Sequence, residues 1–124
     1  MGKSVNDTVL DGAFDILDQA DLMTVCNAEP TTFAEATTDF SLAEIAMTPN
    51  TDFTKANGDT SGRKVTVAAK SAVDILVSDT ATHVALTKST GSVLLYVTTC
   101  TSQALTSGGT VDIPAWDIEI ADPT

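Results

Sequence analysis

The sequence predicts a mainly β protein: one antiparallel β-sandwich or jelly-roll-like domain over residues 1–124, with a single N-terminal α-helix. Three observations support this fold class. The first twenty residues place apolar side chains with a helical period. The chain after Asp21 instead consists of short β-branched runs broken by Gly, Pro, Asn and Asp. A length of 124 residues suits one domain with one core.

The helix is expected at about residues 5–19. Asn6 or Asp7 is suited to cap its first turn, because a side-chain oxygen at that position accepts a backbone N–H. Gly12 lies in the helix interior and weakens it by roughly 1 kcal/mol relative to alanine. The apolar face consists of Leu10, Ala13, Phe14 and Leu17, and the carboxylates of Asp7, Asp11, Asp15 and Asp18 lie largely elsewhere.

The β-sandwich is expected over about residues 21–120. Seven or eight short strands at this spacing are typical of a sandwich or barrel. The stretch 28–40 has no clear period and is expected to be an extended arm or a long loop. Candidate strands are residues 22–27, 42–47, 51–56, 64–69, 73–78, 81–88, 92–99, 110–113 and 116–120.

Alternation within the strands predicts how they lie. Residues 64–69 alternate, which directs Val65 and Val67 inward. The run "VLLYV" at 93–97 is apolar on both faces, so we expect it in the middle of a sheet or against the helix. The apolar residues before and after Pro114 have opposite parity. A bulge or corner at residues 114–115 would reconcile them, since proline is tolerated at such breaks.

Charge and cysteine content restrict the partners. The formal net charge is -11, which repels nucleic acid and anionic membranes and favours basic or cation-bridged protein surfaces. The apolar runs are too short to span a bilayer, and the N-terminal stretch lacks the apolar core of a signal peptide, so folding in a cytoplasm is expected. Cys26 and Cys100 are then expected to be reduced and mostly buried.

The stretch "NGDTSGRK" at 57–64 invites comparison with a phosphate-binding loop. Such a loop has four residues between its glycines, then a lysine and a hydroxyl residue. Here Gly58 and Gly62 enclose only three residues, and Val65 stands where the hydroxyl belongs. A strand pattern follows in place of a helix. We therefore predict a hairpin turn, in which "NGD" supplies the residues with positive φ.

No residue pattern indicates catalysis or a metal. His83 is the single histidine and is expected on the outward face of its strand, without a nucleophile motif beside it. The two cysteines are far apart in sequence, and the acidic stretches lack the calcium-loop pattern. We expect no enzyme activity, no cofactor and no metal site.

Four residues are candidates for a protein interface. Arg63, Lys64 and Lys70 form a basic stretch in an acidic chain, either a salt-bridging edge or a patch that meets an acidic neighbour. Trp116 is the single tryptophan. It is either a core residue that shares a face with Ile118 and Ile120 or an interface anchor, and the core is favoured.

Three stretches resemble a family of small proteins that recur in tailed-bacteriophage genomes. They are "NGDTSGRKVTVAAK", "ATHVALTKSTGSVLLYVTTC" and "TVDIPAWDIEIADPT", and the resemblance covers most of residues 4–124. The size and β-rich pattern are similar to head-decoration, or cement, proteins. The resemblance carries no catalytic residue.

The resemblance implies a non-enzymatic virion protein, assembled in the host cytoplasm, that stabilises the head lattice. Its partners would be the major capsid protein or other virion proteins, and a homo-oligomer, dimer or trimer, is expected. Two alternatives stay open: a tail, neck or fibre-attachment component of the virion, and a carbohydrate-binding β-sandwich.

Overall fold

The computed structural model describes residues 3–123 and is mainly β, with one N-terminal α-helix and antiparallel sheets, as the sequence predicted. The Asn6 side chain caps the helix by accepting the backbone N–H of Thr8 at 2.8 Å. The described elements are α1 (Asp7–Leu17), β1 (Leu22–Cys26), the π-helix η1 (Glu35–Asp39), β2 (Ser41–Ala46), β3 (Phe53–Asn57), β4 (Arg63–Val67), β5 (Lys70–Asp74), β6 (Asp79–Lys88), β7 (Val93–Leu105), β8 (Thr110–Ile113) and β9 (Trp116–Ile120).

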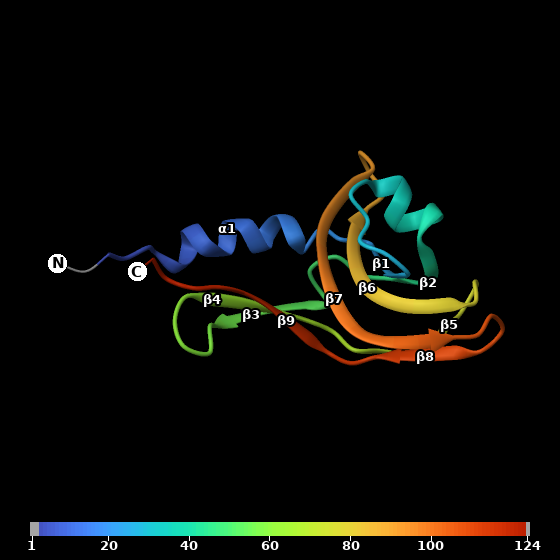
Figure 1. The fold of residues 1–124 in the computed structure, drawn as a ribbon. Helices are drawn as coiled ribbons and strands as arrows, with labels where there is room; N and C mark the ends of the chain where they lie inside the picture. The colour runs from blue at the N-terminus through green and yellow to red at the C-terminus, as the bar shows by residue number, and fades with distance from the viewer. Residues whose placement is uncertain (1–2, 124) are drawn as a thin grey trace.

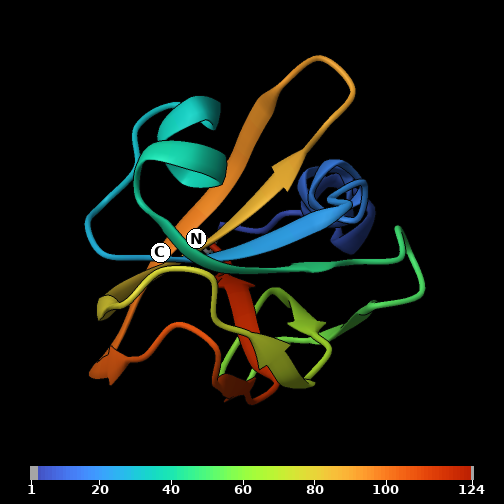
Figure 2. The same cartoon turned by 90° about the vertical axis from the view of Figure 1, so that its right-hand side faces the viewer.

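The strands form three antiparallel sheets. Their orders are β2-β1-β6-β7, β3-β4-β9 and β5-β8. Figure 1 shows a rounded part, in which β6 and β7 curve strongly toward β5 and β8, and an arm in which α1 lies along β4. Figure 2 views the rounded part end-on, with η1 on the far side of the four-stranded sheet from β8.

One hydrophobic core runs through both parts. Val65 and Val67 are fully buried, which confirms the inward direction predicted from the alternation in β4. From α1, Leu10 and Phe14 are buried, so the helix covers the arm sheet with one narrow face. The largest fully buried side chains are Phe14, Met23, Leu42, Leu86, Val65, Val67 and Val73.

The stretch 28–40 was expected to be an extended arm or a long loop, which is wrong for the part that forms η1. Thr32 Oγ1 accepts the backbone N–H of Glu35, and the Glu35 carboxylate accepts the N–H and hydroxyl of Thr31, which together satisfy the start of a helical turn. Ala36 is fully buried behind this turn, and η1 contacts β1, β2 and β6. The Thr-x-x-Glu spacing was a visible signal for this helix.

One strand prediction needs correction. The strand expected at 73–78 is β5 at 70–74, and Leu76 and Val77 beyond it are exposed. The run 93–97 belongs to β7, which lies at the edge of its sheet and contacts α1, the second of the two places expected for it. The corner at residues 114–115 is confirmed, because β8 pairs with β5 whereas β9 pairs with β4.

The stretch 57–64 is the turn of the β3–β4 hairpin, as predicted. The Gly58 N–H donates to the Gly62 carbonyl at 2.9 Å, which closes the turn. The positive φ lies at Gly62, with a value of 72°, and not in "NGD". The turn also binds the end of β9, since Asp59 N donates to Glu119 Oε1 at 2.9 Å.

Candidate interface

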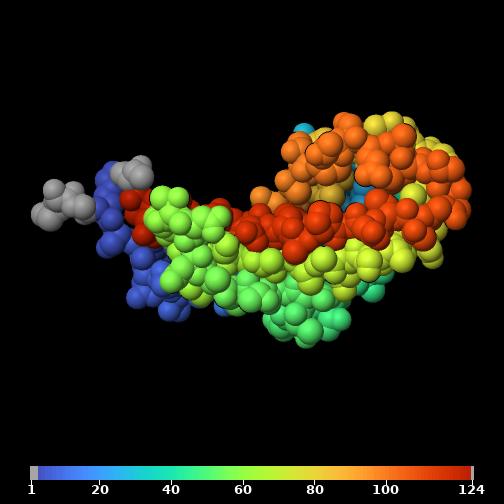
Figure 3. Space-filling view, turned by 90° about the horizontal axis from the view of Figure 1, so that it is seen from below, coloured from blue at the N-terminus to red at the C-terminus, as the bar shows by residue number. Residues whose placement is uncertain are grey.

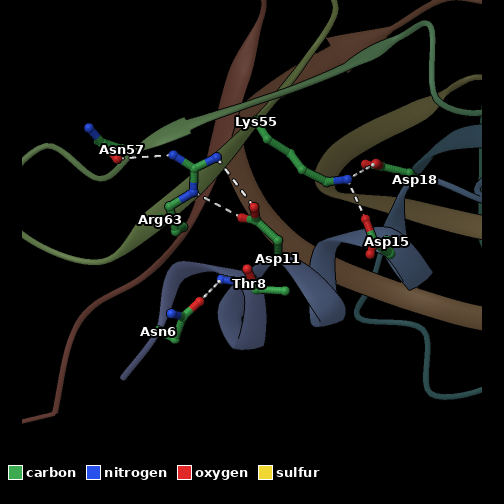
Figure 4. A network of polar contacts seen from close by, with 8 residues as sticks. All are labelled: Asn6, Thr8, Asp11, Asp15, Asp18, Lys55, Asn57 and Arg63. Atoms are coloured by element: carbon green, nitrogen blue, oxygen red, sulfur yellow. Dashed lines mark hydrogen bonds and ion pairs between the residues drawn. The ribbon is translucent and has the colours of Figure 1, made fainter. Parts of the chain in front are cut away.

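Arg63 joins the arm sheet to α1. Its Nε donates to Asp11 Oδ1 at 2.9 Å, its Nη2 lies 3.4 Å from Asp11 Oδ2, and its Nη1 donates to Asn57 Oδ1 at 3.0 Å (Figure 4). The Asp11 carboxylate raises the pKa of Arg63 through this hydrogen bond. The Arg63 side chain is 18% exposed. Its donors are therefore largely occupied within the chain.

The other predicted cations are also paired with carboxylates of the same chain. Lys64 Nζ lies 2.8 Å from Asp59 Oδ1 and 3.4 Å from Asp117 Oδ2. Lys70 Nζ lies 3.0 Å from Asp52 Oδ2. Burial alone would raise the pKa of Asp52, but hydrogen bonds from the Thr48 backbone and from Lys70 outweigh it and lower that pKa.

A further cation was not singled out from the sequence. Lys55 on β3 reaches across to α1 and pairs with Asp15 and with Asp18 Oδ2, the latter at 2.9 Å (Figure 4). Hydrogen bonds to Asp15 and Asp18 raise the pKa of Lys55. Together with the Arg63 pair, this contact fixes the helix to the hairpin. Such pairs join positions about forty to fifty apart in sequence, so no local pattern reveals them.

The basic stretch is thus a salt-bridging edge, one of the two interpretations that the sequence left open. Arg63 and Lys64 are half-buried, and each is ion-paired with a carboxylate of the same chain. A role in binding an acidic partner stays a prediction. Because these cations are paired within the chain, the remaining carboxylates set the sign of the surface charge.

Arg63 and Lys64 provide a matched test of this assignment. Arg63→Glu places a carboxylate against Asp11 and breaks the link between α1 and β4, whereas Lys64→Glu faces two carboxylates that are 71% and 39% exposed. Both changes alter the net charge equally. We expect the larger fall in Tm for Arg63→Glu, with partial recovery in the Asp11→Arg, Arg63→Glu double variant. Equal losses in thermal unfolding would contradict a specific link.

Trp116 is a half-buried core residue at the start of β9. Its ring centroid lies 5.9 Å from that of Tyr96 on β7, with the two ring planes tilted by 30°. Trp116 packs against the core beside Ile118, as the shared strand face predicted. Its Nε1 is buried without a hydrogen-bond partner among residues 3–123.

An open seam runs along Trp116. We define the seam as the gap between β7, at the edge of the four-stranded sheet, and the chain from β8 to β9. It holds a hollow of about 280 Å³ between β7 and β8, visible in Figure 3 between the orange and red strands, and a second of about 240 Å³. The two hollows share Val84, Cys100 and Pro114.

The seam was missed in the sequence because strand order is not a local property. The run "VLLYV" at 93–97 is no signal for it, because the β7 residues that line the two hollows are Thr98 to Thr101, Gln103 and Leu105. Leu94 to Val97 are half-buried at the edge of the sheet, and Leu95 and Tyr96 line a different groove, beside α1. The part of β7 along the seam is therefore mostly polar, and apolar lining comes from residues such as Val84, Leu105 and Ile113.

His83 and the cysteines do not form an activated pair. Cys26 lies opposite His83 across β1 and β6, but its thiol is buried and donates toward the Ala36 carbonyl. Burial raises the pKa of Cys26, whereas a nucleophilic thiolate needs a lowered pKa. His83 is half-buried, with Nδ1 at 2.9 Å from Thr82 Oγ1. Both cysteines are free; Cys26 is buried and Cys100 half-buried.

Metal ligands do not cluster in the described part of the chain. Within residues 3–123, no three His, Cys, Asp or Glu side chains gather to hold a metal ion. No helix in the same range is both long and apolar enough to cross a membrane.

No protein-family model, curated protein sequence or solved structure matches the chain.

Proposed function

We propose that the chain is a non-enzymatic structural protein of a bacteriophage virion that decorates the head and stabilises its lattice by binding the major capsid protein. The observation that carries the proposal is the seam: an edge strand that is only partly covered by its own fold, beside two hollows with apolar lining from Val84, Leu105 and Ile113, is surface that a protein partner can bury. The resemblance of three stretches of the sequence to small phage proteins supports the same assignment.

The mechanism is mechanical. Many copies would each bridge neighbouring shell subunits and add buried area that the shell lacks, which favours the assembled state by mass action. The chain is acidic, and at least four of its cations are already paired with its own carboxylates. The shell surface it binds is therefore basic or cation-bridged, and attachment weakens as salt rises.

Copy number in purified particles tests the proposal. A decoration protein is present on the order of hundreds of copies, in fixed ratio to the shell subunit, whereas a neck or tail component is present in about a dozen. Quantitative mass spectrometry of particles measures this ratio. Particles that lack the protein should lose DNA at a lower temperature, and adding the purified protein back should restore them. A dozen copies, or no restoration, would contradict head decoration.

A further inference from the structure

The outer face of α1 carries the two most exposed large apolar side chains in the described part of the chain. Val9 is 66% and Ile16 is 63% exposed, and they lie seven residues apart on one helical face. Gly12 and Ala13 lie between them and are also exposed. We call these four residues the α1 stripe. In Figure 1 the side of α1 that faces away from β4 has no other element packed on it.

The fold itself does not require the α1 stripe. Leu10 and Phe14 bury the helix against the core, and ion pairs to Arg63 and Lys55 fix it through two of its aspartates. Gly12 is also unexplained within one chain: a Cβ there would meet nothing within 4 Å, and its φ is not positive. Glycine weakens a helix interior relative to alanine, and no contact within the monomer requires a glycine at this position.

We propose that the α1 stripe is the contact between two copies of this chain, packed as antiparallel helices about a two-fold axis that passes between Gly12 and Ala13. Val9 and Ile16 are equally far from the midpoint of these two residues. In an antiparallel pair, Val9 of one copy therefore lies beside Ile16 of the other. Gly12 lets the two backbones approach closely at the crossing, and a two-fold contact uses the same surface twice.

The charges near the stripe favour a second copy as its occupant. The stripe holds no charged residue, and the nearby Asp11 and Asp15 are neutralised by Arg63 and Lys55. Repulsion between two acidic chains thus falls on other surfaces, where salt screens it. A basic partner would find no available carboxylate on the stripe itself. Two identical acidic chains cannot offer each other surfaces of opposite charge, but they can pack uncharged apolar surfaces together.

A stable dimer would have to use the groove beside the α1 stripe as well as the stripe. A specific interface buries about 1,000 Å² or more, which exceeds what two helical turns supply. The stripe continues through Ala13 and Ile16 into a groove of about 390 Å³ that can receive side chains of the second copy. Its other lining residues are Phe14, Leu17, Leu95, Tyr96, Ile118, Ile120 and one carboxylate, Glu119, whose Oε1 accepts the Asp59 N–H within the same chain.

Sedimentation velocity on the isolated full chain tests the proposal. The chain should dimerise with rising concentration, and raising NaCl from about 50 to about 500 mM should tighten the dimer by screening repulsion. The Val9→Glu, Ile16→Glu variant should weaken it at least roughly tenfold. The Leu76→Glu, Val77→Glu variant is the matched control, because it adds the same charge at exposed apolar residues elsewhere, and it should remain a dimer.

Gly12→Leu distinguishes this specific helix packing from nonspecific hydrophobic association. Leucine favours the helix and meets open space in the monomer, so Tm at low concentration should not fall, yet it fills the crossing and should weaken the dimer roughly tenfold. A monomer at all concentrations, a trimer, equal loss in both glutamate variants, or a tighter Gly12→Leu dimer would overturn the proposal. All readouts use isolated protein, so the outcome is independent of the virion role.

Discussion

Replacement of Phe14 by alanine is expected to lower the free energy of unfolding by about 3–5 kcal/mol, the usual cost of removing a buried aromatic side chain. Phe14 is fully buried and is the largest side chain that α1 contributes to the core. The exchange also improves helix propensity, so a loss cannot be attributed to a poorer helix. Urea unfolding at low protein concentration measures the difference.

Val9→Ala is the matched control on the same helix. Val9 is 66% exposed, and the change should alter the free energy of unfolding by less than about 0.5 kcal/mol when the chain is monomeric. Hydrogen exchange should show increased opening of α1 and of the arm sheet in Phe14→Ala, since α1 packs along β4. A loss below about 1 kcal/mol for Phe14→Ala would mean that α1 is not part of the cooperative core.

Local patterns predicted those parts of the fold that depend on neighbouring residues. The period of α1, the inward direction of Val65 and Val67, and the corner after β8 all follow from spacing along one segment. The capping spacing from Thr32 to Glu35 was equally local, but it lay in a stretch judged to have no period. Pro30 and Thr31 stand directly before it and do not continue a helical period.

The candidate interface could be predicted less well, because its character depends on contacts between distant segments. Arg63 was recognised as a notable cation, but its partner Asp11 lies 52 positions away. Likewise, "VLLYV" was correctly identified as a strand, but its place at a sheet edge follows from the order of all four strands. The sequence therefore identified residues of interest, and only the fold showed whether each was paired within the chain or exposed to solvent.

Gly62→Ala is expected to lower the free energy of unfolding by about 2–4 kcal/mol, from backbone strain and steric overlap together. Gly62 has a φ of 72°, which strains any residue with a Cβ. A Cβ there would also lie 1.9 Å from the Ile120 carbonyl oxygen, so the end of β9 would have to move. Because β9 pairs with β4, this movement would disturb the sheet that supports α1.

Gly108→Ala isolates the contribution of backbone strain. Gly108 has a φ of 91°, but a Cβ there would meet nothing within 4 Å, so its replacement should cost about 1 kcal/mol from strain alone. The difference between the two variants, measured by urea unfolding, reports the contact between the hairpin turn and β9. Equal losses would show that the turn does not pack on β9 in solution. A larger loss of unfolding free energy for Gly62→Ala would show that this glycine has a structural role: it lets the turn at 58–62 approach β9 closely.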